Sequence, residues 1–308
     1  MTIAAIDIGT NTVLLLIARV ESGGGITTLV SEQRIPRLGK GVEGRRRLHP
    51  DAMERTVAAV AECRSVIAPY SPAVVAVTGT SALRDAENRE EFARLLRDGT
   101  GYALEVISGR DEALLSFRGT LSGFPPGLRA TLLDIGGGST ELTVGTMGGI
   151  DESMSADVGA LRLTERYLHH DPPAPQELAD ARNAISEALE PADRFPFHGS
   201  ELIGIAGTVT SLAHLALRKS DFDPSILQGA RLSRSTVEEL TATLTQLPVS
   251  RIRALSAVLE GRSDIITAGA LILREVMHRF GFRECTVSER GLRYGVVLRE
   301  WEKRQAAI

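Results

Sequence analysis

The sequence of 308 residues has very little cysteine, and this limits the chemistry that it can support. Cys63 and Cys285 are the only cysteines, and they lie far apart in the chain. A disulfide framework needs several paired cysteines, and a cysteine-rich metal site needs closely spaced ones. We therefore expect neither, and we expect each thiol to behave as a small buried apolar group.

Long apolar runs are also missing. The run VLLLIARV at 13–20 is much shorter than the roughly 20 residues that a membrane-spanning helix needs. The chain begins with a strand-like segment, which lacks the basic start and the cleavage site of a signal peptide. These features predict a cytoplasmic protein that has no membrane partner.

The sequence has no excess of positive charge. Its formal net charge is −4 and its pI is about 5.9, so that nucleic acid is not expected as a partner. Lysine is scarce, and most basic residues are arginines, which suit bidentate phosphate contacts. Genome composition is the simpler explanation of that bias. The run Arg45–Arg47 could guide a polyanion, although a solvated loop is the simpler explanation.

The most informative feature that is present is a motif that occurs twice. The first copy is IAAIDIGTNT at residues 3–12, and the second is TLLDIGGGST at 131–140. Each is an apolar strand followed by Asp-Ile-Gly and by small or hydroxyl residues. Glycine lets the backbone approach a ligand closely, and successive N–H groups form a concavity that binds anions. Asp7 and Asp134 would supply hard oxygen ligands for Mg²⁺. The repeat predicts two similar lobes that close on a phosphate chain.

The pattern of strands and helices after each copy sets the expected fold. In both halves three strand-like segments precede alternating helices and strands, which is typical of α/β proteins. We predict two duplicated lobes with a cleft between them, an N-terminal one over 1–126 and a C-terminal one over 127–308. The Gly/Pro-rich segment 123–127 is the expected linker. This division leaves the final helix, about 293–308, free to pack back on the first lobe.

The first copy of the motif is a candidate phosphate and metal site. Asp7 would hold a Mg²⁺-bound water there, and the turn of Gly9, Thr10, Asn11 and Thr12 would bind phosphate. Taken alone, however, this segment is better explained by an ordinary β-hairpin turn.

The second copy carries more glycine. Three consecutive glycines after a strand are costly in entropy unless the backbone passes close to a ligand. Glu141 follows the turn and would complete a cation site with Asp134. A flexible hairpin turn is the alternative, but the presence of the first copy favours phosphate binding. The residues concerned are Asp134, Gly136, Gly137, Gly138, Ser139, Thr140 and Glu141.

Three further segments are weaker candidates when each is taken alone. Gly207 and Thr208 lie in a turn between a strand and a helix that we expect over 209–218. The N-terminus of that helix is a natural anion site, although an ordinary tight turn is equally consistent. Arg84 follows a strand that ends in hydroxyl residues, and a surface ion pair would explain it as well. Glu112 lies in the first turn of a helix, where acidic residues usually serve helix electrostatics alone.

Together these segments resemble the exopolyphosphatase/guanosine-pentaphosphate phosphatase (Ppx/GppA) family, in its short two-domain type. The similarity covers nearly the whole chain in order. The family belongs to the sugar kinase/Hsp70/actin superfamily, whose duplicated ribonuclease H-like lobes agree with the repeat. The matching segments are DIGTNT at 7–12, TSALRDAENREEF at 80–92, EVISGRDEA at 105–113, DIGGGSTEL at 134–142, GIAGTVTSLA at 204–213 and GLRYGVV at 291–297.

The resemblance implies an enzyme that removes the terminal phosphate of inorganic polyphosphate. Glu112 matches the catalytic glutamate of the family, and Arg84 a phosphate-facing arginine. Asp7, Asp134 and Glu141 match acidic residues around the catalytic Mg²⁺, which Mn²⁺ could replace. The loops that match phosphate contacts include Gly136–Ser139, Gly207 and Thr208. The resemblance also implies a homodimer.

Three other functions remain open at this point. The same site could hydrolyse guanosine pentaphosphate (pppGpp). The chain could also be an ATP-dependent kinase of the same superfamily, or a non-catalytic sensor that binds polyphosphate or an alarmone. Release of phosphate from polyphosphate in the absence of an acceptor would distinguish a hydrolase from the kinase and from the sensor.

Overall fold

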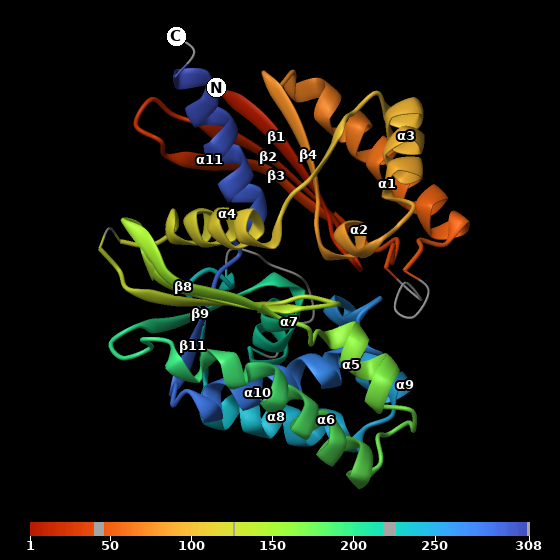
Figure 1. Cartoon of the computed structure of the whole chain (residues 1–308), viewed down its shortest axis with the longest axis vertical. Helices are drawn as coiled ribbons and strands as arrows, with labels where there is room; N and C mark the ends of the chain where they lie inside the picture. Colours follow the sequence, from red (N-terminus) through yellow and green to blue (C-terminus); the bar gives the residue numbers. More distant parts are fainter. Residues whose placement is uncertain (40–45, 126, 218–225, 307–308) are drawn as a thin grey trace. The chain divides into compact units, whose positions relative to one another are not determined.

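The computed structural model describes residues 1–39, 46–125, 127–217 and 226–306 (Figure 1). The chain divides into two compact units. Unit 1 consists of Met1–Gly123 and Arg290–Ile308, and unit 2 consists of Phe124–Glu289. Residue 126, where the sequence places the end of the first lobe, lies outside the described residues, as does Arg45 of the arginine run.

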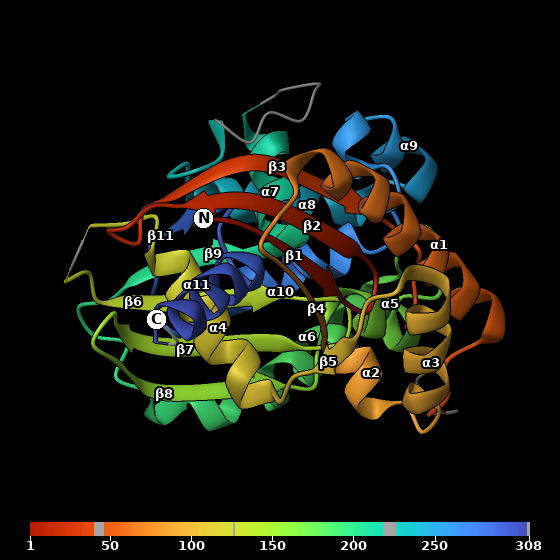
Figure 2. The ribbon, with the colours of Figure 1, turned by 90° about the horizontal axis from the view of Figure 1, so that it is seen from above.

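Unit 1 is built on a sheet of five strands in the order β3-β2-β1-β4-β5. The first three strands are antiparallel neighbours, seen side by side in Figure 2, and β4 and β5 continue the sheet in parallel with β1. Their bounds are Thr2–Ile8 (β1), Val13–Val20 (β2), Ile26–Arg34 (β3), Val74–Gly79 (β4) and Leu104–Val106 (β5).

Helices cover both faces of this sheet, which explains why β1 is apolar almost throughout. Helices α1 (Pro50–Ile67) and α3 (Arg89–Thr100) cover one face, and α4 (Gly109–Leu121) and α11 (Leu292–Gln305) cover the other (Figure 1). Ala4, Ile6 and Ile8 cluster with residues of α1 and α3, whereas Ile3 and Ala5 cluster with residues of α4 and α11. Because side chains alternate along a strand, Asp7 points to the α4 and α11 side. The unit also contains η1 (Ala68–Tyr70) and α2 (Ser81–Asp85).

Helices α4 and α11 cross at backbone contact distance within unit 1. A Cβ atom at Gly295 would overlap the carbonyl oxygen of Leu115, and one at Gly119 would overlap the backbone of Gly291 and Gly295. The Oγ1 hydroxyl of Thr120 donates to the carbonyl of Arg290 at 3.0 Å. The two glycines therefore let the C-terminal half of α4 pack closely against the start of α11.

Unit 2 repeats the plan on a sheet of six strands in the order β10-β11-β9-β6-β7-β8. Strands β6, β7 and β8 are antiparallel neighbours, and β9 and β11 continue the sheet in parallel with β6. The short antiparallel edge strand β10 is not expected from the sequence, because three residues carry too little alternation to be recognised. The bounds are Ala130–Ile135 (β6), Thr140–Thr146 (β7), Gly149–Ala156 (β8), Glu201–Ile205 (β9), Arg231–Ser233 (β10) and Glu284–Val287 (β11).

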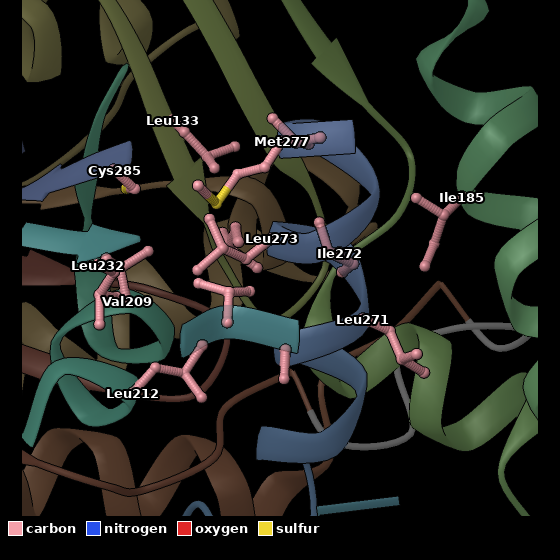
Figure 3. Close-up of a cluster of buried hydrophobic side chains, with 14 of the residues drawn as sticks. Leu133, Ile185, Val209, Leu212, Leu232, Leu271, Ile272, Leu273, Met277 and Cys285 are labelled. Carbon is pink, nitrogen blue, oxygen red and sulfur yellow. The ribbon is translucent and has the colours of Figure 1, made fainter. Parts of the chain in front are cut away.

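The core of unit 2 is centred on α10. Its side chains Leu271, Ile272, Leu273 and Met277 pack with residues of β6 and α7, and the thiol of Cys285 lies in the same cluster (Figure 3). The helices are α5 (Ala160–Tyr167), α6 (Pro175–Leu189), η2 (Glu190–Arg194), α7 (Ala206–Ala216), α8 (Arg234–Gln246), α9 (Val249–Arg253), η4 (Ala257–Leu259) and α10 (Ile266–Arg279).

The α/β architecture that the sequence predicts is confirmed. The chain is α/β, and each unit opens with the same three antiparallel strands followed by parallel ones. Both cysteines are buried and free. None of the helices in the described part of the chain is long and apolar enough to cross a membrane.

Candidate active-site residues and family membership

The first Asp-Ile-Gly copy forms a tight turn between β1 and β2 in unit 1. The N–H of Gly9 donates to the carbonyl of Thr12 at 2.9 Å. The loop after β3 is hydrogen-bonded to this turn, since the N–H groups of Gly39 and Arg37 donate to the carbonyls of Thr10 and Asn11, respectively. Asn11 is 8% exposed, and its buried Nδ2 has no hydrogen-bond partner among the residues that the structure describes. A buried donor of this kind suits an anionic ligand, because an unsatisfied polar group is costly.

Asp7 ends the strand that leads into this turn. Its Oδ1 atom is buried and finds no hydrogen-bond donor in the described ranges. The pKa of Asp7 is raised to about 7: burial and, to a smaller extent, the nearby Glu112 carboxylate raise it, and the positive charge of Arg293 lowers it. A cation would compensate a buried carboxylate oxygen that lacks a donor. Asp7 therefore fits the predicted role of a metal ligand.

Glu112 lies in the first turn of α4, which is capped by the side chain of Ser108. Arg84, in the last turn of α2, donates from Nη1 to Glu112 Oε2 at 2.5 Å and to the carbonyl of Ile107 at 3.3 Å. The side chains of Arg84 and Glu112 are 23% and 13% exposed. Burial raises the pKa of Glu112, and the charge and hydrogen bond of Arg84 oppose this rise. Unit 1 thus brings together three of the predicted residues: Asp7, Arg84 and Glu112.

Arg293 is a member of this group that sequence reasoning missed. It lies in the first turn of α11, and its Nη1 donates to the carbonyl of Leu15 at 2.7 Å and to Ser31 Oγ at 3.2 Å. These bonds hold its positive charge on the side of the sheet where Asp7 lies. The segment GLRYG marked this region, but no local signal connects it with a strand near the N-terminus.

The second Asp-Ile-Gly copy forms the corresponding turn between β6 and β7 in unit 2. Gly136 N–H donates to the carbonyl of Ser139 at 3.0 Å, as Gly9 does to Thr12 in the first copy. The start of α5 packs on this turn, where Leu161 and Arg162 donate their N–H groups to the carbonyl of Gly137. We refer to the turn Gly136–Thr140 as the glycine turn.

Asp134 and Glu141 lie next to this turn and opposite each other. They are paired residues of the antiparallel strands β6 and β7, so that their side chains share one face of the sheet. Glu141 is 8% exposed and accepts a hydrogen bond from Ser155 Oγ at 2.7 Å. The equivalent partner of Asp7 in unit 1 is Leu14. Unit 2 therefore has a carboxylate, Glu141, at the strand position where unit 1 has a leucine.

The predicted helix after β9 begins earlier than expected. Helix α7 starts at Ala206, so that Gly207 and Thr208 lie in its first turn rather than before it. Thr208 Oγ1 donates to the carbonyl of Ile135 at 3.2 Å, which fixes this helix to the end of β6. The guanidinium of Arg262 lies directly against Gly207, where a Cβ atom would overlap it. Burial lowers the pKa of Arg262 to about 10. Arg262 is another residue of this region that the sequence does not reveal.

The acidic residues form pairs within each unit. Within the described ranges, no group of three or more His, Cys, Asp or Glu side chains is placed to hold a metal ion. Mg²⁺ is commonly bound by one or two carboxylates, with water and substrate phosphates completing its shell. Two carboxylates are thus enough protein ligands for a Mg²⁺ site of this kind.

The comparison with family models decides the family. The model of the Ppx/GppA phosphatase family matches residues 16–304. The chain belongs to the Ppx/GppA phosphatase family. This confirms the resemblance found in the sequence motifs.

Named relatives agree with the Ppx/GppA assignment. The chain is 38% identical over 311 residues to exopolyphosphatase 2 of Mycobacterium tuberculosis, covering 96% of this chain and 97% of the relative. It is 29% identical over 309 residues to exopolyphosphatase 1 of Mycobacterium bovis, covering 97% of this chain and 88% of the relative.

Solved structures of the Ppx/GppA family share the fold. An exopolyphosphatase from Cytophaga hutchinsonii superposes with a TM-score of 0.91 at 27% identity, covering 98% of both chains. The Aquifex aeolicus family member gives a TM-score of 0.84 at 28% identity, covering 99% of this chain and 98% of that one. The predicted fold class is therefore confirmed.

Proposed function

We propose that this Ppx/GppA-family protein is an exopolyphosphatase. It hydrolyses the terminal phosphoanhydride bond of inorganic polyphosphate and releases orthophosphate. The observation that carries this proposal is the largely buried ion pair of Arg84 and Glu112 beside Asp7 in unit 1. The identity of 38% to an exopolyphosphatase over nearly the whole chain supports the same substrate class.

Glu112 acts as the general base of this reaction. A buried carboxylate with a raised pKa is a stronger proton acceptor than an exposed one, and such a base contributes roughly 10²–10⁴-fold to a rate. Glu112 takes a proton from water, and the oxygen of that water bonds to the terminal phosphorus. The bond from this phosphorus to the bridging oxygen breaks, and the polyphosphate leaves one phosphate shorter. Arg84 stabilises charge on the phosphate oxygens.

Asp7, Asp134 and Glu141 are the proposed protein ligands of Mg²⁺, or alternatively of Mn²⁺. The buried and unsatisfied Oδ1 of Asp7 supports a cation in unit 1, and the facing carboxylates of Asp134 and Glu141 support one in unit 2. When bound, Mg²⁺ neutralises charge on the phosphate oxygens.

Backbone N–H groups and hydroxyls of two hairpin turns and one helix start bind the phosphates. Glycine-rich turns of this kind leave the backbone accessible to an anion. The residues are Gly9, Thr10, Asn11, Thr12, Gly136, Gly137, Gly138, Ser139, Thr140, Gly207 and Thr208. Hydrolysis of pppGpp, the homodimer and the cytoplasmic location stay predictions of the sequence.

Phosphate release tests this function directly. The wild type and Glu112→Gln are incubated with Mg²⁺, Mn²⁺ or EDTA, and with either a ladder of polyphosphate lengths or pppGpp. Glu105→Gln is the control, because Glu105 is an exposed glutamate of unit 1 that pairs with Arg299. We expect the wild type and the control to release orthophosphate from polyphosphate, and Glu112→Gln and EDTA to abolish this release. Tight binding without turnover would instead indicate a sensor, and turnover of pppGpp alone would change the substrate.

A further inference from the structure

The segment from Asp157 to Arg162 wraps around the glycine turn of unit 2. Thr140 Oγ1 donates to the carbonyl of Val158 at 2.6 Å, and Arg162 N–H donates to the carbonyl of Gly137 at 3.0 Å. Between these points, a Cβ atom at Gly159 would lie 2.5 Å from the backbone nitrogen of Ser139. Both ends of the segment are therefore fixed to the glycine turn.

Within this segment the side chains of Asp157 and Arg162 form an ion pair. The Arg162 side chain is largely buried, at 15% exposure, whereas the Asp157 carboxylate is 81% exposed. A carboxylate that is mostly in water holds its partner weakly, by about 0–1 kcal/mol. A phosphate group can replace it, because guanidinium binds phosphate oxygens through two parallel hydrogen bonds.

We propose that Arg162 is a substrate-binding residue for polyphosphate and that Asp157 competes with phosphate for its guanidinium. The inference rests on the proposed function, in which the glycine turn binds phosphate. It adds Asp157 and Arg162 to the residues that control this binding. Arg162 binds phosphate oxygens when substrate arrives, and Asp157 returns to it when substrate leaves. The pair therefore sets the affinity for the polyanion, whereas Glu112 sets the rate of hydrolysis.

A purely structural role of the pair makes a different prediction. An acidic residue before a helix stabilises that helix through its dipole, so that Asp157→Asn would lower stability and leave substrate affinity unchanged. Competition with phosphate predicts the opposite, because removal of the carboxylate charge leaves the guanidinium more available to the substrate. The sign of the change in KM thus separates the two roles.

The test measures KM and kcat for polyphosphate at several salt concentrations. We expect Arg162→Gln to raise KM by about tenfold with kcat within about twofold, and to weaken the salt dependence, because a charge-assisted bond is lost. Asp157→Asn should lower KM by about threefold, and Arg162→Lys should recover part of the affinity. Arg231→Gln and Glu284→Gln are the controls, since this exposed pair of unit 2 has a distance of 3.2 Å and the same charges.

A binding measurement keeps this inference separate from the proposed function. Calorimetry with polyphosphate and the Glu112→Gln protein reports affinity without turnover. In this Glu112→Gln background, Arg162→Gln should weaken polyphosphate binding and Asp157→Asn should strengthen it. These two results would support the proposed roles of Arg162 and Asp157 even if the wild type released no phosphate. An unchanged affinity in both variants, or a loss in Asp157→Asn, would overturn the inference even if the wild type were an active exopolyphosphatase.

Discussion

The guanidinium of Arg84 donates to the carboxylate of Glu112 at 2.5 Å within unit 1, although 28 residues separate the two in the chain. Helix α2 supplies the arginine and helix α4 supplies the glutamate. Burial favours the neutral form of Glu112, and Arg84 favours the ionised form that can accept a proton. The ion pair with Arg84 therefore helps to keep the largely buried Glu112 carboxylate ionised, as a general base must be.

Replacement of Glu112 by glutamine should abolish activity and keep the fold. The amide is similar in shape to the carboxylate but cannot accept a proton from water, so we expect phosphate release to fall by about 10²–10⁴-fold. Phosphate release and thermal unfolding measure the two effects. A variant with more than a tenth of the wild-type rate would contradict the role of Glu112 as the base.

Asp7→Asn should make stability less dependent on pH. Burial, with a smaller contribution from the Glu112 carboxylate, raises the folded-state pKa of Asp7 from 3.8 to about 7, so the folded protein keeps this proton at pH values where the unfolded chain has lost it. The free energy of unfolding should therefore fall as pH rises from about 4 to about 7, by on the order of 4 kcal/mol, and stay low above that. Urea unfolding in EDTA at pH 5 and pH 8 measures this. An equal pH dependence in Asp7→Asn and wild type would contradict it.

Gly295→Ala should destabilise unit 1. A methyl group there would overlap the Leu115 carbonyl at the crossing of α4 and α11, and overpacking of this kind costs about 1–3 kcal/mol. Gly109→Ala, in the first turn of α4, is the matched control, because a Cβ atom there meets nothing within 4 Å. Urea unfolding followed by the fluorescence of Trp301, the only tryptophan, reports on this unit. Equal stability of the two variants would show that the helices can separate at no cost.

Ala206→Gly should stabilise unit 2. Ala206 has a φ of +64°, a left-handed conformation that costs an L-residue about 1–2 kcal/mol and glycine almost nothing. After the larger entropy of glycine in the unfolded chain is subtracted, we expect a gain of about 0.5–1 kcal/mol. Ala184→Gly, inside the ordinary helix α6, should lose about 1 kcal/mol in the same unfolding assay. A loss in both variants would mean that the Ala206 methyl group matters more than its strain.

The local pattern of the sequence predicted most of the architecture. Apolar runs bounded by Asp-Ile-Gly gave the strands and their turns, and the copies around Asp7 and Asp134 gave the duplicated plan. These are short-range signals, since strand formation and tight turns depend on neighbouring residues. The early start of α7 was missed, because a left-handed alanine is not a helix signal.

Contiguous motifs encode the family, the α/β plan and the identity of the candidate acidic residues, so these could be predicted before the fold was known. Which charged side chains interact with one another depends on how the chain folds. Arg293 lies near Asp7 and Arg262 lies against Gly207, and in both cases the partners come from distant parts of the chain. Packing of helices on sheets brings such residues together, and no local periodicity carries that information.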